Sequence, residues 1–183
     1  MINAPNAITL ARFALIPAIA LELHQRHDNT AFVLFIISAA SDLADGLIAR
    51  RWNLRTRFGA IADPLADKLT MLTAALMLTL QDSLPWWFTL ALVLRDVLIV
   101  GGALAYQVVI GPVEIAPTAL SKLNTGLQFL LVLSVLTIRA GHVSEGVWAD
   151  VLLLTTLATI VLSGGQYVLL WGSKAAEARK GSA

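Results

Sequence analysis

Cysteine is absent from the 183 residues, and this excludes both disulfide bonds and thiolate metal sites. Charge is scarce as well, because only 14% of the residues are charged, whereas a soluble domain has about 25%. No Lys or Arg precedes the first apolar run and no convincing cleavage site follows it, so we expect no cleavable signal peptide. Hydrophobic residues make up 57% of the chain, and the mean hydropathy is +0.76. This composition predicts a polytopic membrane protein with a single domain, residues 1–183.

Six apolar segments are each compatible with the roughly 20 residues that cross a bilayer core. We therefore expect an all-α fold with six transmembrane helices, preceded by a short interfacial helix at residues 2–10. Arg12, in the first span, either snorkels toward the interface or faces a lipid phosphate. The first span should end near Leu23, and the others should cover about 30–50, 59–80, 85–106, a stretch beginning near 121, and 148–171.

Four aspartates lie in the second and third apolar segments: Asp42, Asp45, Asp63 and Asp67. A charge at the centre of a spanning helix costs roughly 2.5–3.5 kcal/mol, while each Leu or Ile returns only about 0.3–0.6 kcal/mol. The carboxylates should therefore line a wet cavity or bind cations. The spacing of three or four residues within each pair places its members on one helix face, and clustered carboxylates suit Mg²⁺ or Mn²⁺ bound with a phosphorylated substrate. The alternative is that each aspartate pairs with a nearby cation such as Arg50, Arg51 or Lys68.

A short loop at residues 51–58 is rich in arginine, and short basic loops lie in the cytoplasm. With six spans, both termini lie on the side of this loop, together with most of the Lys and Arg residues. This topology places the aspartates at the cytoplasmic face, and together with the compact chain it favours a bacterial inner membrane. The loop arginines either set topology alone or also hold lipid or nucleotide phosphates.

Arg95 and Asp96 are adjacent inside the fourth apolar segment, so we expect them not to face lipid. Successive helical residues point about 100° apart, which predicts that these two side chains contact different partners. Gly101 and Gly102, in the same segment, predict a close contact with another helix.

The aspartate region follows a continuous pattern: D-x-x-D-G-x-x-A-R, then eight residues, G, three residues, D, three residues and D. On this motif the chain resembles the CDP-alcohol phosphatidyltransferases. The opening segment PNAITLARFALIP is similar to that of the family, and LRDVLIV and APTALSKLNTGLQFLLV most resemble cardiolipin synthases of the eukaryotic type. Weaker similarity to phosphatidylglycerophosphate synthases runs through the first half, and the resemblance fades after about Arg139.

The resemblance implies roles for the motif residues. Asp67 would be the base that takes a proton from an attacking hydroxyl, within hydrogen-bond reach. The other three aspartates would hold Mg²⁺ or Mn²⁺, with Asp67 close enough to share in it. Small residues would leave room for the cytidine and ribose, and an arginine would help to secure the nucleotide. The metal set is thus Asp42, Asp45, Asp63 and Asp67, and the CDP-lipid set is Gly46, Ala49, Arg50 and Gly59.

The resemblance also implies the reaction, in which an alcohol attacks the phosphorus of CDP-diacylglycerol that bears the diacylglycerol, and CMP leaves. We expect phosphatidylglycerol as the acceptor, which gives cardiolipin, and glycerol 3-phosphate as the alternative. Glycerol 3-phosphate is nearly dianionic and should need several more cations, whereas the fourth and fifth segments supply only Arg95 and Lys122. Arg57 of the basic loop is a further candidate for the acceptor phosphate. We also expect a homodimer in the membrane, and no nucleic-acid partner.

Two other classes of protein use intramembrane aspartates. Membrane prenyltransferases bind Mg²⁺-diphosphate through paired aspartate motifs, but they resemble longer helical bundles. A small cation transporter would use the aspartates as an ion path, but it would not require Gly46, Arg50 and Gly59 at the family spacing. Release of CMP from CDP-diacylglycerol in the presence of an alcohol separates both classes from the transferase.

Overall fold

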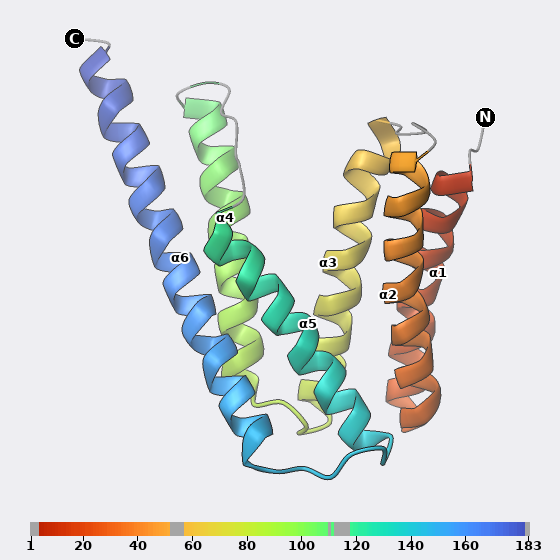
Figure 1. Cartoon of the computed structure of the whole chain (residues 1–183). Coiled ribbons are helices and arrows are strands. Elements are labelled where there is room, and N and C mark those ends of the chain that lie inside the picture. Colours follow the sequence, from red (N-terminus) through yellow and green to blue (C-terminus); the bar gives the residue numbers. More distant parts are fainter. Residues whose placement is uncertain (1–3, 52–56, 110, 112–117, 182–183) are drawn as a thin grey trace. The chain divides into compact units, whose positions relative to one another are not determined.

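The structure, a computed structural model, describes residues 4–51, 57–109, 111 and 118–181, with side chains described at 9–44, 62–108, 111 and 118–174. Over these residues the chain forms six helices and no strand, which confirms the predicted all-α class (Figure 1). The helices are α1 (Ala4–His24), α2 (Asp28–Arg51), α3 (Arg57–Leu80), α4 (Trp86–Val109), α5 (Ala119–Arg139) and α6 (Val147–Gly181).

The first helix differs from the expectation, and the last extends beyond its expected span. The separate interfacial helix at residues 2–10 is wrong for the described residues, because residues 4–10 form the first turns of α1. Pro5 is compatible with this, since the first helical turn has no partner for a backbone N–H. α6 contains the span expected at 148–171 and continues beyond it to Gly181, because its tail consists largely of Ala, Glu, Lys and Arg, which favour helix.

Among the residues that the structure describes, three helices are long and apolar enough to cross a membrane: Trp86–Val108, Ala119–Arg139 and Val147–Lys174. They expose large apolar side chains, among them Val97, Leu104, Val161 and Leu169. Such a surface is unfavourable in water and suited to contact with lipid tails. The chain is therefore an integral membrane protein. Spans at α1, α2 and α3, which carry the buried and clustered charges, stay a prediction.

The helices group into two compact units, and each is described by itself. Unit 1 comprises Met1–Leu84 and Val132–Glu145, and unit 2 comprises Pro85–Leu131 and Gly146–Ala183. α5 thus contributes its first part to unit 2 and its last part to unit 1.

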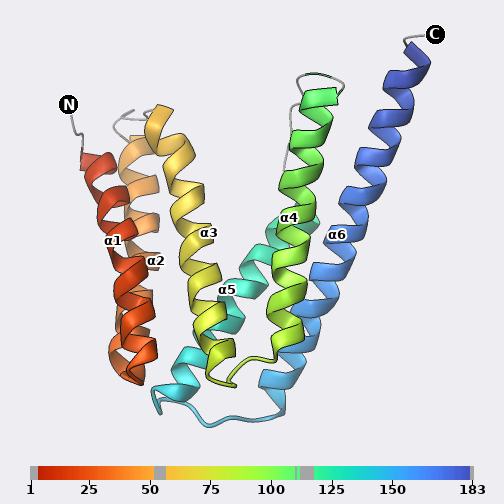
Figure 2. The same ribbon diagram turned by 180° about the vertical axis from the view of Figure 1, so that it is seen from behind.

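In unit 1, α1 packs against both α2 and α3, as two opposite views show (Figures 1 and 2). Ile19 and Leu23, one turn apart on α1, are fully buried, as are Phe35 of α2 and Leu78 of α3. The start of α1, the end of α2 and the start of α3 lie at the same end of this unit in both views. Polar residues near those three helix ends are therefore brought close together.

At the opposite end of unit 1, Arg139, the last residue of α5, contacts residues of two other elements. Its Nη2 lies 2.6 Å from Oδ1 of Asp28, and its Nη1 donates to Oγ of Ser83 at 2.7 Å. Asp28 is the first residue of α2, where a negative charge also interacts favourably with the helix dipole. Arg139 thereby links α2, α5 and the turn after α3.

In unit 2, α4 packs against α6. A Cβ atom at Gly102 would lie only 2.7 Å from Nε1 of Trp171 on α6, and the Trp171 ring lies 5.6 Å from the ring of Tyr106. Nothing lies within 4 Å of a Cβ at Gly101. The predicted close helix contact is therefore confirmed at Gly102 and does not involve Gly101.

Candidate active site

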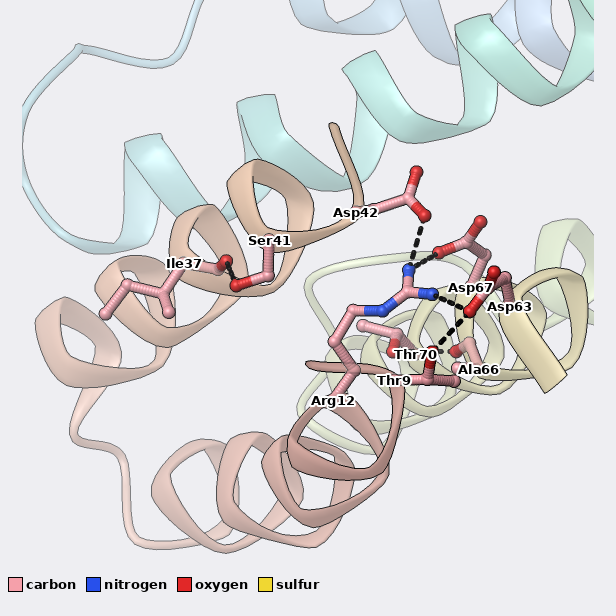
Figure 3. Close-up of polar contacts among 9 residues, drawn as sticks. All are labelled: Thr9, Arg12, Ile37, Ser41, Asp42, Asp63, Ala66, Asp67 and Thr70. Carbon is pink, nitrogen blue, oxygen red and sulfur yellow. Dashed lines mark hydrogen bonds and ion pairs between the residues drawn. The ribbon is translucent and has the colours of Figure 1, made fainter. Parts of the chain in front are cut away.

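Five polar side chains from three helices meet near the start of α1 (Figure 3). Thr9 and Arg12 are three residues apart on α1 and share a face, while Asp63 and Asp67 are four apart on α3 and share another. Asp42 comes from α2. Because α1 packs against both other helices, its polar face is presented to all three carboxylates.

The guanidinium of Arg12 is the centre of this cluster. Its Nη1 donates to Oδ1 of Asp42 at 2.7 Å and to Oδ1 of Asp67 at 2.5 Å. Its Nη2 donates to Oδ1 of Asp63 at 3.2 Å, and the hydroxyl of Thr9 donates to the same oxygen at 2.6 Å. One cation therefore joins carboxylates from two helices, as the dashed lines in Figure 3 show.

The cluster has a buried side and an open side. The side chain of Arg12 is 1% exposed, whereas those of Asp42, Asp63 and Asp67 are 39%, 36% and 50% exposed. A buried charge is tolerated only when it is paired, and removing one partner of a buried ion pair costs about 3–5 kcal/mol. With all three carboxylates ionised, one guanidinium leaves the cluster with two net negative charges. The open side is therefore a place that attracts cations.

The structure gives Arg12 partners that were not predicted from the sequence, because its buried guanidinium is bound to three carboxylates. Snorkelling toward the interface and contact with a lipid phosphate stay predictions. The alternative interpretation, in which aspartates pair with a cation, is seen for Asp42, Asp63 and Asp67, and the cation that the structure shows is Arg12, which was not predicted. A sequence signal for this was present, because Thr9 and Arg12 are polar residues at helical spacing in an apolar segment.

Six predicted site residues lie outside the described side chains, although their backbones belong to α2 and α3. Their roles stay predictions. They are Asp45, Gly46, Ala49 and Arg50 in α2, and Arg57 and Gly59 in α3.

A second buried arginine, Arg95 of α4, lies in unit 2. Its Nη2 donates to Oγ of Ser121 on α5 at 2.6 Å and to Oγ of Ser163 on α6 at 3.0 Å. The expectation that Arg95 avoids lipid is confirmed, since it is 8% exposed. The expectation that Arg95 and Asp96 have different partners is wrong in part, because the flexible arginine also turns back to donate to Oδ1 of Asp96 at 2.9 Å. Lys122, the other acceptor candidate in this unit, is exposed on α5.

The sequence model of the CDP-alcohol phosphatidyltransferase family matches residues 2–162, a range that contains the complete aspartate motif. The chain belongs to this family. It is therefore a transferase enzyme, and the carboxylates that surround Arg12 are three of the four aspartates of the phosphatidyltransferase motif.

Relatives with two different names are similar to this phosphatidyltransferase. A Mycobacterium tuberculosis (strain ATCC 25618 / H37Rv) protein provisionally named cardiolipin synthase is 34% identical over 172 residues, which cover 93% of this chain and 79% of that protein. The cardiolipin synthase (CMP-forming) of Rattus norvegicus is 28% identical over 193 residues, covering 97% of this chain and 64% of the rat protein. The CDP-diacylglycerol--glycerol-3-phosphate 3-phosphatidyltransferase of Bacillus subtilis (strain 168) is 33% identical over 184 residues, covering 91% and 94% of the two chains.

Phosphatidyltransferases of this family generally use a divalent metal. The donor set fits such an ion, because three partly exposed carboxylates are hard oxygen ligands. Figure 3 shows the second oxygens of Asp42 and Asp67 pointing away from Arg12. Among the side chains that the structure describes, no three His, Asp or Glu residues form a group ready to hold a metal ion, and the carboxylates are arranged around Arg12 instead.

Proposed function

We propose that this phosphatidyltransferase is a metal-dependent cardiolipin synthase, which transfers a phosphatidyl group from CDP-diacylglycerol to phosphatidylglycerol and releases CMP. The observation that carries the proposal is the meeting of Asp42, Asp63 and Asp67, at family motif positions, on one partly exposed cluster. The names of the mycobacterial and rat relatives support cardiolipin as the product.

We propose Mg²⁺ or Mn²⁺ as the metal, because carboxylate oxygens suit these ions and substrate phosphates complete their coordination. When bound, the ion would offset the negative charge of the pyrophosphate and hold it against the cluster. The proposed ligands are Asp42, Asp45, Asp63 and Asp67, and the proposed CDP-lipid contacts are Gly46, Ala49, Arg50 and Gly59.

Asp67 is proposed as the general base. Of the three described carboxylates it is the most exposed, at 50%, so a substrate hydroxyl can reach it from the open side. As the acceptor oxygen bonds to the phosphorus that bears the diacylglycerol, its proton passes to the carboxylate of Asp67. The bond between that phosphorus and the CMP oxygen breaks, and CMP leaves with the bonding electrons. Arg12 contacts Asp67 from the buried side, which leaves the other side for the substrate.

The choice of acceptor rests on the supply of cations. The proposed acceptor contacts are Arg57, Arg95 and Lys122, and Arg95 is already bound by Asp96 and two serines. Phosphatidylglycerol is a monoanion and needs less compensation than glycerol 3-phosphate, whose phosphate is nearly dianionic. The alternative function, phosphatidylglycerophosphate synthase, is supported by the Bacillus subtilis relative, which is matched over 94% of its length.

The cellular setting is also a proposal. The arginines at and between the end of α2 and the start of α3 favour a bacterial inner membrane with the carboxylate cluster facing the cytoplasm, where CDP-diacylglycerol carries its soluble head group. The family resemblance and the glycines of α4 and α6 favour a homodimer.

A competition assay tests the acceptor. Purified protein with Mg²⁺ or Mn²⁺ and labelled CDP-diacylglycerol is offered phosphatidylglycerol and glycerol 3-phosphate together. Labelled cardiolipin is the expected product. Labelled phosphatidylglycerophosphate would keep the transfer chemistry and establish the alternative acceptor. Absence of CMP release with either alcohol, in protein shown to be folded, would overturn both the proposed and the alternative function.

A further inference from the structure

We propose that Arg12, assisted by Thr9, is a positioning residue for the metal ligands: it holds the inner oxygens of the carboxylates so that their outer oxygens face a divalent cation. This inference rests on the metal dependence proposed above. It assigns a function to the first helix, which contributes none of the motif residues.

The packing of unit 1 supports this role. Asp42 lies on α2 and Asp67 on α3, and both of these helices pack against α1. The inner oxygens of the two carboxylates bond to the same nitrogen of Arg12, at 2.7 and 2.5 Å, so like charges from two helices are held close together. Without a cation between them, these carboxylates would repel each other and separate. Arg12 is therefore placed to set the spacing of these two carboxylates, which come from different helices.

Thr9 adds a second, uncharged restraint. Its hydroxyl is fully buried and donates to the inner oxygen of Asp63, which also accepts from Nη2 of Arg12. A carboxylate with two donors on one oxygen has little rotational freedom, and its other oxygen is directed by them. Hydrogen bonds of this kind to metal-ligating carboxylates typically change metal affinity by 10–100-fold.

Charge alone predicts the opposite role for Arg12, which is to weaken metal binding. A guanidinium near a dication repels it, so removing the positive charge of Arg12 would tighten metal binding if charge decided the outcome. Positioning predicts weaker binding instead. The sign of the change in metal affinity therefore separates the two roles.

The experiment measures Mn²⁺ affinity by electron paramagnetic resonance on the full-length protein in lipid nanodiscs, without substrate. Arg12→Gln should bind Mn²⁺ about 10–100-fold more weakly than the parent. Arg12→Lys should also bind Mn²⁺ more weakly, because the lysine ammonium keeps the positive charge but cannot bridge three carboxylates as the planar guanidinium does. Thr9→Val, which keeps every charge and nearly the same shape, should show a smaller loss. Arg139→Gln is the matched control, since it breaks an arginine–aspartate pair at the other end of unit 1 and should leave Mn²⁺ affinity unchanged.

The outcomes are distinguishable. Equal or tighter Mn²⁺ binding by folded Arg12→Gln overturns the positioning role while leaving the proposed metal site intact. If Arg12→Gln does not fold, Thr9→Val decides, and unchanged affinity in it overturns the inference. If the parent protein binds no Mn²⁺, or if Asp63→Asn leaves its binding unchanged, the proposed metal site and this inference both fail.

Discussion

Asp67→Asn is the substitution that most directly tests whether Asp67 acts as the base while the other carboxylates of the cluster bind the metal. Asparagine has nearly the same size as aspartate, and its amide oxygen can still accept the hydrogen bond that Arg12 donates at 2.5 Å. Arg12 also keeps its bonds to Asp42 and Asp63. The substitution therefore removes a base while it leaves most of the local geometry in place.

The expected loss follows from the role of a general base, which contributes about 10²–10⁴-fold to a rate. This corresponds to about 2.7–5.4 kcal/mol of transition-state stabilisation, at about 1.36 kcal/mol for each factor of ten. Mn²⁺ and CDP-diacylglycerol binding should fall much less, since Asp42 and Asp63 keep their charges. The rate is measured as CMP release with saturating phosphatidylglycerol, and binding is measured on the same preparation without acceptor.

Asp28→Asn is the matched control for Asp67→Asn. Asp28 is also paired with an arginine in unit 1, at 2.6 Å from Arg139, but it begins α2 at the end away from the cluster. Its substitution should lower thermal stability and leave CMP release nearly unchanged. Equal losses of binding and transfer in Asp67→Asn would refute its assignment as the base, and near-parental transfer would do the same.

Three further predictions concern packing, the acceptor and assembly. Gly102→Ala should lower the free energy of unfolding by about 1–3 kcal/mol relative to Gly101→Ala, because only the former places a methyl group against Trp171. Equal unfolding of the two variants, measured side by side, would contradict this. Arg95→Gln should raise KM for the acceptor more than KM for CDP-diacylglycerol, and steady-state kinetics that show equal changes would contradict an acceptor role. Native mass spectrometry from lipid should give twice the 19.6 kDa mass of the chain, and a monomer would contradict the predicted homodimer.

Much of the fold was predictable because apolar length and polar breaks are local properties of a chain. The predicted segments at 30–50 and 59–80 correspond to α2 and α3. Arg95 is buried, which confirms the prediction that it does not face lipid. The predicted span at 148–171 lies within the apolar stretch Val147–Lys174, and α6 extends past it because its polar tail has helix propensity without apolar character. The contact between Arg95 and Asp96 was missed because backbone direction does not limit a long side chain.

For the candidate site, the sequence by itself determined which residue types are present and at what spacing. Spacing along a helix places carboxylates on shared faces, and a charge in an apolar segment requires a function, so the residues themselves indicated a cation site. The motif from Asp42 to Asp67 indicated the family and the class of reaction through its resemblance to the family pattern, and the family model confirms the family. Only the tertiary structure decided what those carboxylates contact. Arg12 is 30 residues from Asp42 and 55 from Asp67 along the chain, so their meeting depends on how α1 packs against α2 and α3, which no local pattern encodes.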